Sequence, residues 1–139
     1  MKIYVASSWR NTRHSTVVTI LRGVGHDVYD FKNPEGKSFH WSEIDPDWQK
    51  WGPGEFQKGL DHPLAVEGFA QDKKALDDCE VCVLLLPCGR SAHLEAGYAV
   101  GQGKPTYILL SKGEQPELMY KFCTPCLYIG ELVRLLKTH

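Results

Sequence analysis

The residues Val81 to Leu86 form the most apolar run of the chain, and they constrain its fold more than any other feature. The run is far too short to span a membrane. Together with Glu80 it predicts a strand over Glu80–Leu86. Strands that are apolar throughout are typical of parallel sheets, in which helices cover both faces.

Strand-like runs alternate with helical patterns along most of the chain. Lys2–Ala6 and His26–Phe31 are predicted strands, and the apolar spacing at 17–24 between them predicts a helix, which together make a βαβ unit. The later predicted elements are a helix over Pro63–Asp78, a helix over Ser91–Gln102, a strand over Thr106–Leu110, a short helix over Pro116–Lys121, a strand over Leu127–Ile129 and a helix over Glu131–Lys137. We therefore expect an α/β fold: a flavodoxin-like, doubly wound, five-stranded and mostly parallel sheet in the order 2-1-3-4-5, with helices on both faces.

Residues 32–62 interrupt this alternation. They contain Trp41, Trp48 and Trp51, together with several prolines and glycines. A long irregular stretch inside a compact domain is usually functional, and aromatic side chains suit a flat ligand ring. We expect one domain over residues 1–139 with an irregular, aromatic-rich insertion that covers the substrate and includes Trp41 in the site. The alternative is a surface excursion held by its own aromatic side chains.

The charge balance excludes one large class of partners. Sixteen Lys and Arg residues against seventeen Asp and Glu residues give a net charge of −1. Without a basic excess, a nucleic-acid polymer is not an expected partner. The chain also starts directly with a strand pattern instead of a signal peptide, so we expect a cytoplasmic protein with no membrane partner.

Five cysteines include two CxxC pairs, Cys79 with Cys82 and Cys123 with Cys126. Zinc ribbons use such pairs on polar turns, whereas Cys82 lies inside the apolar run. Ordinary packing is therefore favoured over zinc, and the odd number argues against a complete disulfide framework. No metal site is expected.

An acid borders the small-residue stripe of the helix that follows the apolar strand. The stripe consists of Ala92, Ala96, Ala99, Val100 and Gly103. Glu95 lies three residues after Ala92 and four before Ala99, so it flanks the face that packs on the sheet. The alternative is a solvated glutamate that the helix dipole favours in the first turn.

The preceding helix contains a second acid of this kind. Ala65, Phe69, Asp72 and Leu76 share one helical stripe, which places Asp72 among apolar residues. An acid on a sheet-facing stripe needs a partner or a function. Two such acids near one strand edge suggest a carboxylate pair with divided roles, as in glycosyl transfer with retention.

Polar residues surround the edge of the sheet where these acids are expected. In the order 2-1-3-4-5, a ligand binds at the carboxyl ends of strands one and three. Arginine and the N–H groups of a helix N-terminus both suit a phosphate. His93 is either a ligand contact or a solvent-facing first-turn residue. The candidate substrate-binding residues are Ser7, Ser8, Trp9, Arg10, Gly89, Arg90, Ser91, His93 and Trp41.

These residues give the chain a family resemblance. It resembles the nucleoside 2-deoxyribosyltransferase family, including the related nucleoside 5′-monophosphate N-glycosidases. The likeness covers most of the chain outside residues 32–62. The matching motifs are Lys2-Ile3-Tyr4-Val5-Ala6, Phe69-Ala70-Gln71-Asp72, Asp78-Cys79-Glu80-Val81, Leu94-Glu95-Ala96-Gly97-Tyr98-Ala99 and Gly103-Lys104-Pro105.

The resemblance implies an enzyme of nucleotide metabolism that needs no cofactor. Glu95 would be the nucleophile that forms a covalent glycosyl-enzyme, and Asp72 would handle the base. Tyr4 would either position Glu95 or pack in the core. A second base or water would then take the sugar. In this family a neighbouring subunit often completes the site, so we expect a homodimer or larger homo-oligomer.

Two loops depart from the family's transferases. Ser7-Ser8-Trp9-Arg10 replaces a Gly-Pro-Phe loop, and Gly89-Arg90-Ser91-Ala92-His93 replaces an acidic D-x-G-T approach to the nucleophile. Both changes add positive or hydroxyl character. The arginine in the first loop resembles the relatives that hold a 5′-phosphate and hydrolyse nucleotides. The alternatives are a non-catalytic nucleotide-binding module and a glycohydrolase of an NAD-like dinucleotide.

The apolar segment near the end of the chain has two possible roles. Its residues are Leu132, Val133, Leu135 and Leu136. They either supply a subunit interface or pack on the sheet of their own chain.

Overall fold

The computed structural model describes residues 1–138, which form two compact units. The first contains Met1–Asp30 and the chain from Leu76 onward, and the second contains Phe31–Ala75. The first unit holds the sheet and the second holds the stretch that interrupts the strand–helix alternation.

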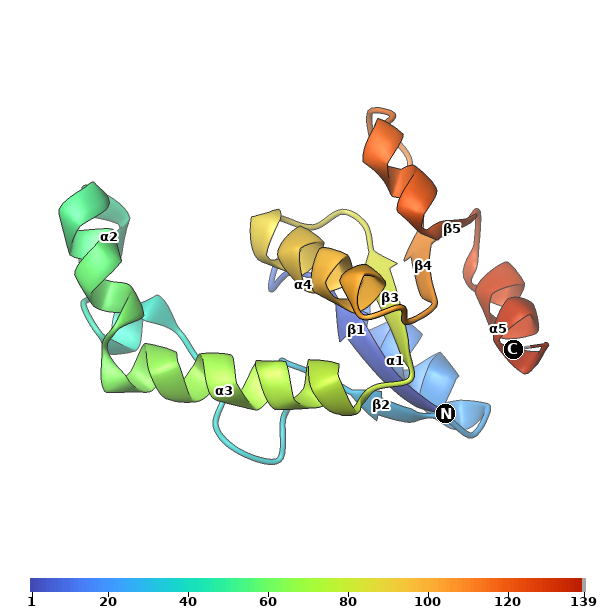
Figure 1. Ribbon diagram of the computed structural model, residues 1–139, viewed down its shortest axis with the longest axis horizontal. Coiled ribbons are helices and arrows are strands. Elements are labelled where there is room, and N and C mark those ends of the chain that lie inside the picture. The colour runs from blue at the N-terminus through green and yellow to red at the C-terminus, as the bar shows by residue number, and fades with distance from the viewer. Residues whose placement is uncertain (139) are drawn as a thin grey trace. The chain divides into compact units, whose positions relative to one another are not determined.

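A five-stranded parallel sheet forms the centre of the first unit (Figure 1). Its order is β2-β1-β3-β4-β5 with every neighbouring pair parallel, which confirms the predicted 2-1-3-4-5 arrangement. The strands are β1 (Lys2–Ala6), β2 (Asp27–Tyr29), β3 (Val81–Leu85), β4 (Thr106–Leu109) and β5 (Thr124–Cys126). Every residue of β3 is buried, as the apolar run predicts.

Helices and short 3₁₀ turns connect the strands. The helices are α1 (His14–Gly23), α2 (Pro53–Leu60), α3 (Pro63–Asp78), α4 (Arg90–Gly101) and α5 (Ile129–Lys137). The 3₁₀ turns are η1 (Trp41–Glu43), η2 (Trp48–Lys50) and η3 (Leu118–Phe122). No helix among the described residues combines the length and the apolar character that a membrane crossing needs.

The two faces of the sheet are covered by different helices. Side chains alternate along a strand, so Ile3 and Val5 share one face with α1 and α5, while Tyr4 and Ala6 share the other with α4. On α4, Ala92, Ala96 and Ala99 are buried, so small side chains let the helix approach the sheet closely.

The sequence predicts Gly103 in the buried stripe on α4, and this prediction is wrong. Gly103 lies beyond the end of the helix, is exposed and has a φ of 77°. That left-handed conformation suits glycine and ends the helix. The next residue, Lys104, donates from Nζ to the carbonyls of Leu76 and Asp77 and thereby caps the carboxyl end of α3.

The last strand lies three residues before its predicted position at Leu127–Ile129. β5 is Thr124–Cys126, and the predicted strand residues Leu127 and Tyr128 are exposed. Pro125 disfavours a strand in the sequence, but an edge strand tolerates proline. The terminal helix packs on its own sheet, because Leu132 and Leu136 are buried in the core, which supports the second of the two interpretations of that segment.

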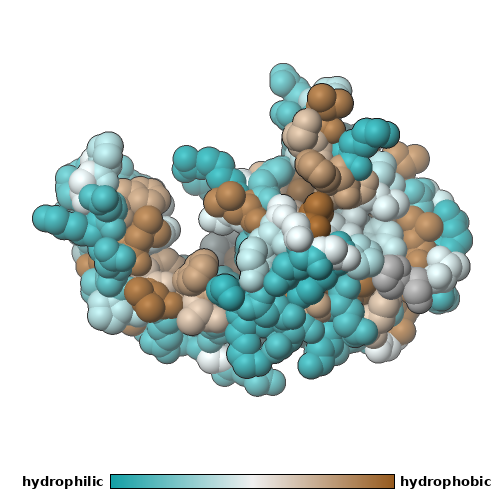
Figure 2. Space-filling model, viewed as in Figure 1, coloured by the Kyte–Doolittle hydropathy of each residue, from teal (hydrophilic) through white to brown (hydrophobic). Residues whose placement is uncertain are grey.

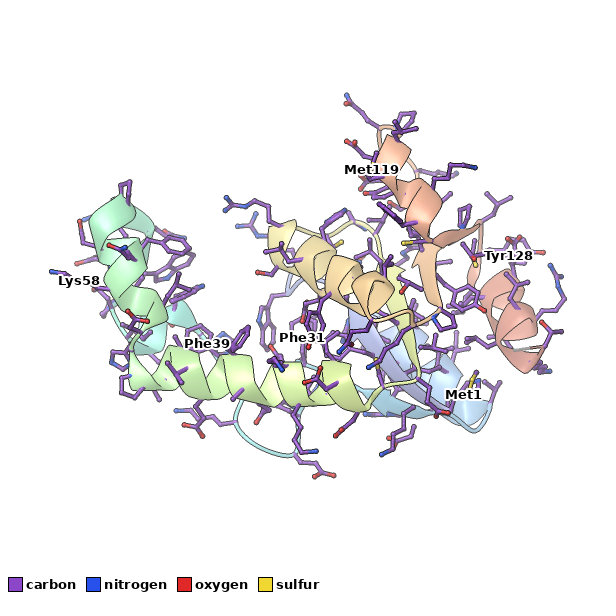
Figure 3. All side chains as sticks on the ribbon, in the orientation of Figure 1. Met1, Phe31, Phe39, Lys58, Met119 and Tyr128 are labelled. Atoms are coloured by element: carbon purple, nitrogen blue, oxygen red, sulfur yellow. The ribbon has the colours of Figure 1, made fainter. Side chains whose placement is uncertain are left out.

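The second unit has an aromatic centre of its own. Trp41 contacts Phe39, Trp51 and Phe56, with ring centroids 4.8 to 5.8 Å apart. Phe39 lies against α3 beside Gly68, where a larger residue would clash with the ring (Figure 3). The stretch is therefore held by its own aromatic side chains. It is also less irregular than predicted, because it includes α2, which Pro53 opens at the first helical position.

Candidate active site

The Tyr4 hydroxyl on β1 donates a hydrogen bond to Oε2 of Glu95 on α4. Tyr4 is 1% exposed and Glu95 is half-buried. Burying a phenol requires a partner for its hydroxyl, and here the partner is the acid that flanks the small-residue stripe. The Tyr4 ring therefore packs in the core while its hydroxyl reaches Glu95.

The negative charge of Glu95 acts on two nearby thiols. Burial raises the pKa of Cys82 well above its ordinary value, and the charge of Glu95 adds to that effect. Burial likewise raises the pKa of Cys88 to about 12, with further contributions from Glu114 and Glu95. Both thiols are therefore neutral at physiological pH, and neither is suited to act as a nucleophile.

Tyr29 stacks on Tyr4 from the neighbouring strand. The two rings are 5.3 Å apart at 13° to each other, and strand pairing places the two residues side by side. The next residue, Asp30, accepts a 2.7 Å hydrogen bond from Nε2 of His14, and both side chains are buried. No local sequence pattern signals these contacts, because they depend on how β2 pairs with β1.

The loop after β1 is tied to the carboxyl ends of β3 and β4. The Asn11 amide donates to the carbonyls of Leu85 (3.3 Å) and Pro87 (3.0 Å), and the Arg13 backbone N–H donates to Asn11 Oδ1 (2.7 Å). The Arg13 guanidinium donates from Nη2 to the carbonyls of Leu86, Leu109 (3.3 Å) and Leu110 (3.2 Å). Sequence reasoning missed both residues, which hold the loops around the site in place.

The polar candidates around this edge divide into buried and exposed groups. Ser7 is buried, and its hydroxyl has no hydrogen-bond partner among residues 1–138. Ser8 is half-buried and accepts at Oγ from the Arg10 backbone N–H (3.2 Å). The remaining candidates Trp9, Arg10, Gly89, Arg90 and Ser91 are exposed. The N-cap residue of α4 is Gly89, which has no side chain to cap the helix, so the first backbone N–H groups of α4 are available to a ligand.

His93 connects α4 to η3. Nδ1 donates to the Gly89 carbonyl (2.7 Å), so in the neutral ring Nε2 accepts from the Tyr120 hydroxyl (2.9 Å). The two rings also stack at 5.7 Å. His93 lines a groove of 850 Å³ between α4 and Gly113–Cys123, and Glu95 is not among the lining residues. His93 therefore contacts both Gly89, in the loop that precedes Glu95, and Tyr120 of the η3 segment.

Two candidates belong to the second unit. Asp72 is half-buried on α3, and Trp41 lies within the aromatic cluster described above. The stripe that suggested Asp72 is only partly buried, because Ala65 and Leu76 are buried whereas Phe69 is 67% exposed. Their roles toward a substrate stay predictions.

The cysteines are reduced, and the described residues contain no group of three His, Cys, Asp or Glu side chains arranged to hold a metal ion. Cys79, Cys82 and Cys126 are buried, and burial raises the pKa of each thiol.

Comparison with solved structures places this arrangement on a known fold. No protein-family model matches the chain, and no curated protein matches it. A CMP N-glycosidase, BcmB, from Clostridium botulinum is similar in structure, with a TM-score of 0.57, 16% sequence identity and 99% of both chains covered. A 2-deoxyribosyltransferase from the psychrotolerant bacterium Bacillus psychrosaccharolyticus has a TM-score of 0.63 and 19% identity, with 95% of this chain and 90% of that chain covered. The chain has their fold.

Proposed function

We propose that this protein cleaves the N-glycosidic bond of a nucleoside or nucleoside 5′-monophosphate, with Glu95 as the nucleophile. The observation that carries the proposal is the hydrogen bond from Tyr4 to Glu95. It lies beside the β1–β3 switch point, where ligands bind in doubly wound folds. Two similar solved structures are named as a CMP N-glycosidase and a 2-deoxyribosyltransferase.

The chemistry follows from a carboxylate held by a phenol. Glu95 attacks the anomeric carbon, and the bond from that carbon to the base nitrogen breaks, with its electron pair leaving on the base. The base takes a proton, for which Asp72 is the proposed donor. Water or a second base then attacks the same carbon and gives up its proton to the Asp72 carboxylate, while the ester bond to Glu95 breaks and the Glu95 carboxylate is restored.

Tyr4 has a defined part in both steps. Its hydroxyl donates to Oε2 of Glu95, which orients the carboxylate and stabilises its negative charge. In the first step this directs the other oxygen toward the sugar. In the second step it stabilises the carboxylate as the leaving group.

Several groups support a phosphorylated substrate. The uncapped N-terminus of α4 offers N–H donors to an anion, and the exposed Arg90 is its first residue. Arg10 is exposed on the loop after β1, and the buried Ser7 hydroxyl is a hydrogen-bond donor for a ligand oxygen. We therefore favour a nucleoside 5′-monophosphate over a nucleoside.

We also propose that the protein forms a homodimer or larger homo-oligomer. The η3 segment carries exposed apolar side chains, with Leu118 77%, Met119 62% and Phe122 69% exposed. Figure 2 shows apolar side chains on this segment, and Figure 3 marks Met119 there. An exposed apolar cluster of this kind is typical of an interaction surface.

The test is a chromatographic screen of nucleosides and nucleoside 5′-monophosphates, each with and without an acceptor base. Release of free base supports the proposal; free sugar indicates hydrolysis, and base exchange indicates transfer. Glu95→Gln should abolish base release, whereas Glu131→Gln on α5, at the opposite face of the sheet, should retain it. Base release by Glu95→Gln at the wild-type rate would disprove the nucleophile assignment. Ligand binding without base release would support a binding module instead.

A further inference from the structure

We propose that Tyr29 is a positioning residue that holds the Tyr4 hydroxyl on Glu95. This inference rests on the proposed function, in which the Tyr4–Glu95 hydrogen bond orients the nucleophile. Tyr29 is not among the candidate site residues named from the sequence. Its role follows from where strand pairing places it.

The geometry places Tyr29 directly against the ring that makes the hydrogen bond. Tyr4 pairs with Tyr29 on β2 and with Cys82 on β3. Cys82 is a small side chain, whereas the Tyr29 ring stacks on Tyr4 at 5.3 Å and 13°. A near-parallel stack restricts rotation of the Tyr4 ring toward β2, which is the edge strand of the sheet. Removing the Tyr29 ring opens that side.

Tyr29 can serve as a support because the chain on both sides of it is anchored. β2 is a three-residue edge strand, and a strand this short gains little rigidity from pairing alone. The carbonyl of Val28 accepts a 2.9 Å hydrogen bond from Nη2 of Arg22. On the other side, Asp30 is bound by the buried His14 at 2.7 Å. Both anchoring residues come from α1, so the helix fixes the backbone that presents the Tyr29 ring.

Loss of the Tyr29 ring should lower kcat and leave the affinity for the substrate unchanged. Catalytic groups need to be held within about 0.5 Å of the productive position, and rings or hydrogen bonds behind them supply that precision. If the Tyr4 ring swings away, the Glu95 carboxylate loses its orientation, while the groups expected to bind the phosphate and base are unchanged. We expect kcat to fall roughly 10- to 100-fold with KM within about threefold.

The kinetic test compares two substitutions at the same position. Tyr29→Leu removes the ring, and Tyr29→Phe keeps it. The expected result is a low kcat for Tyr29→Leu, similar to that of Tyr4→Phe, and a rate within about threefold of wild type for Tyr29→Phe. Tyr128→Leu, at an exposed tyrosine before α5, is the control for loss of a tyrosine elsewhere. Equal rates for Tyr29→Leu and wild type, or equal losses for Tyr29→Leu and Tyr29→Phe, would overturn the proposal.

A second measurement does not depend on activity. Urea unfolding of wild type, Tyr29→Leu, Tyr4→Phe and the double variant forms a double-mutant cycle. If the Tyr29 ring supports the hydrogen bond of the Tyr4 hydroxyl, the effect of Tyr29→Leu on the unfolding equilibrium constant should be at least threefold smaller once that hydroxyl is gone. Effects that multiply independently to within twofold would overturn the proposal. If wild type releases no base from any substrate, the proposed function fails, whereas this cycle still tests the stack.

Discussion

Tyr4 on β1 and Glu95 on α4 are 91 positions apart in the chain, and the Tyr4 hydroxyl donates to the Glu95 carboxylate. The strand brings the phenol into the core, and the small residues of α4 bring the acid close to it. The hydrogen bond restricts the orientation of the Glu95 carboxylate. The first prediction concerns this pair.

Tyr4→Phe should lower kcat roughly 10- to 100-fold and leave KM within about threefold, because the hydrogen bond acts on the nucleophile and not on substrate binding. Steady-state kinetics on the best substrate of the screen measures this. Mass spectrometry of the protein after incubation with a slow-reacting 2′-fluoro nucleoside or its 5′-monophosphate should show an adduct on the wild type and none on Glu95→Gln. An adduct on Glu95→Gln would place the nucleophile elsewhere.

The buried pair of His14 and Asp30 makes a stability prediction. Removing one partner leaves the other buried without its main polar contact, so His14→Leu or Asp30→Leu should each lower the free energy of unfolding by about 3 kcal/mol. The double variant should recover a large part of that loss, since two apolar side chains replace a polar pair. Urea unfolding followed by circular dichroism measures all three. If the double variant loses as much free energy of unfolding as the two single variants together, this account is contradicted.

Asp45 makes the packing of the second unit sensitive to acid. Its pKa lies below the ordinary value because the Trp51 indole N–H and the Asp47 backbone N–H donate to the carboxylate. A lowered pKa in the folded state gives stability that is present above the ordinary pKa of about 3.9 and lost as pH falls through the folded value.

The resulting prediction is that tryptophan fluorescence changes as pH falls below about 4 and that Asp45→Asn removes most of this change. Asp47→Asn serves as the matched control, because its backbone N–H is retained. An acid transition in Asp45→Asn identical to that of wild type would show that other groups cause it.

The thiols should react slowly in the folded protein. Burial raises the pKa of Cys88 to about 12 and also raises the pKa of the half-buried Cys123. The thiolate is the reactive form, so at pH 8 iodoacetamide should label these two residues at least about tenfold more slowly than in the unfolded chain. Peptide mass spectrometry after timed labelling measures each site, with labelling in urea as the reference. Equal rates in the two states would contradict the burial of these thiols.

The exposed apolar side chains of η3 give the prediction on assembly. Light scattering should report a dimer or larger species for wild type, and Leu118→Ser with Phe122→Ser should shift it toward the monomer. Val24→Ser, at an exposed apolar residue beyond the end of α1, is the matched control and should leave the mass unchanged. A monomeric wild type at assay concentration would rule out the proposed assembly.

The sequence predicted the strands of the sheet from local patterns, and the rules for right-handed crossover connections then gave their order. The apolar run of β3 indicated a buried parallel strand, and the small residues of α4 indicated a closely packed helix with an acid at its border. The structure confirmed these elements. Two predictions were wrong. The last strand is Thr124–Cys126, because an edge strand tolerates Pro125. Helix α2 was not predicted, because its first residue is a proline and prolines are also common in loops.

The contacts that organise the candidate site were decided by the tertiary structure. Tyr29 meets Tyr4 only because β2 pairs in one register with β1, and Arg13 meets the ends of β3 and β4 only because the sheet aligns them. Such contacts join residues far apart in the chain, so no local pattern encodes them. The sequence by itself determined most of the strands and helices and where an acid meets a packed face. The register and packing of those elements decided which side chain holds that acid.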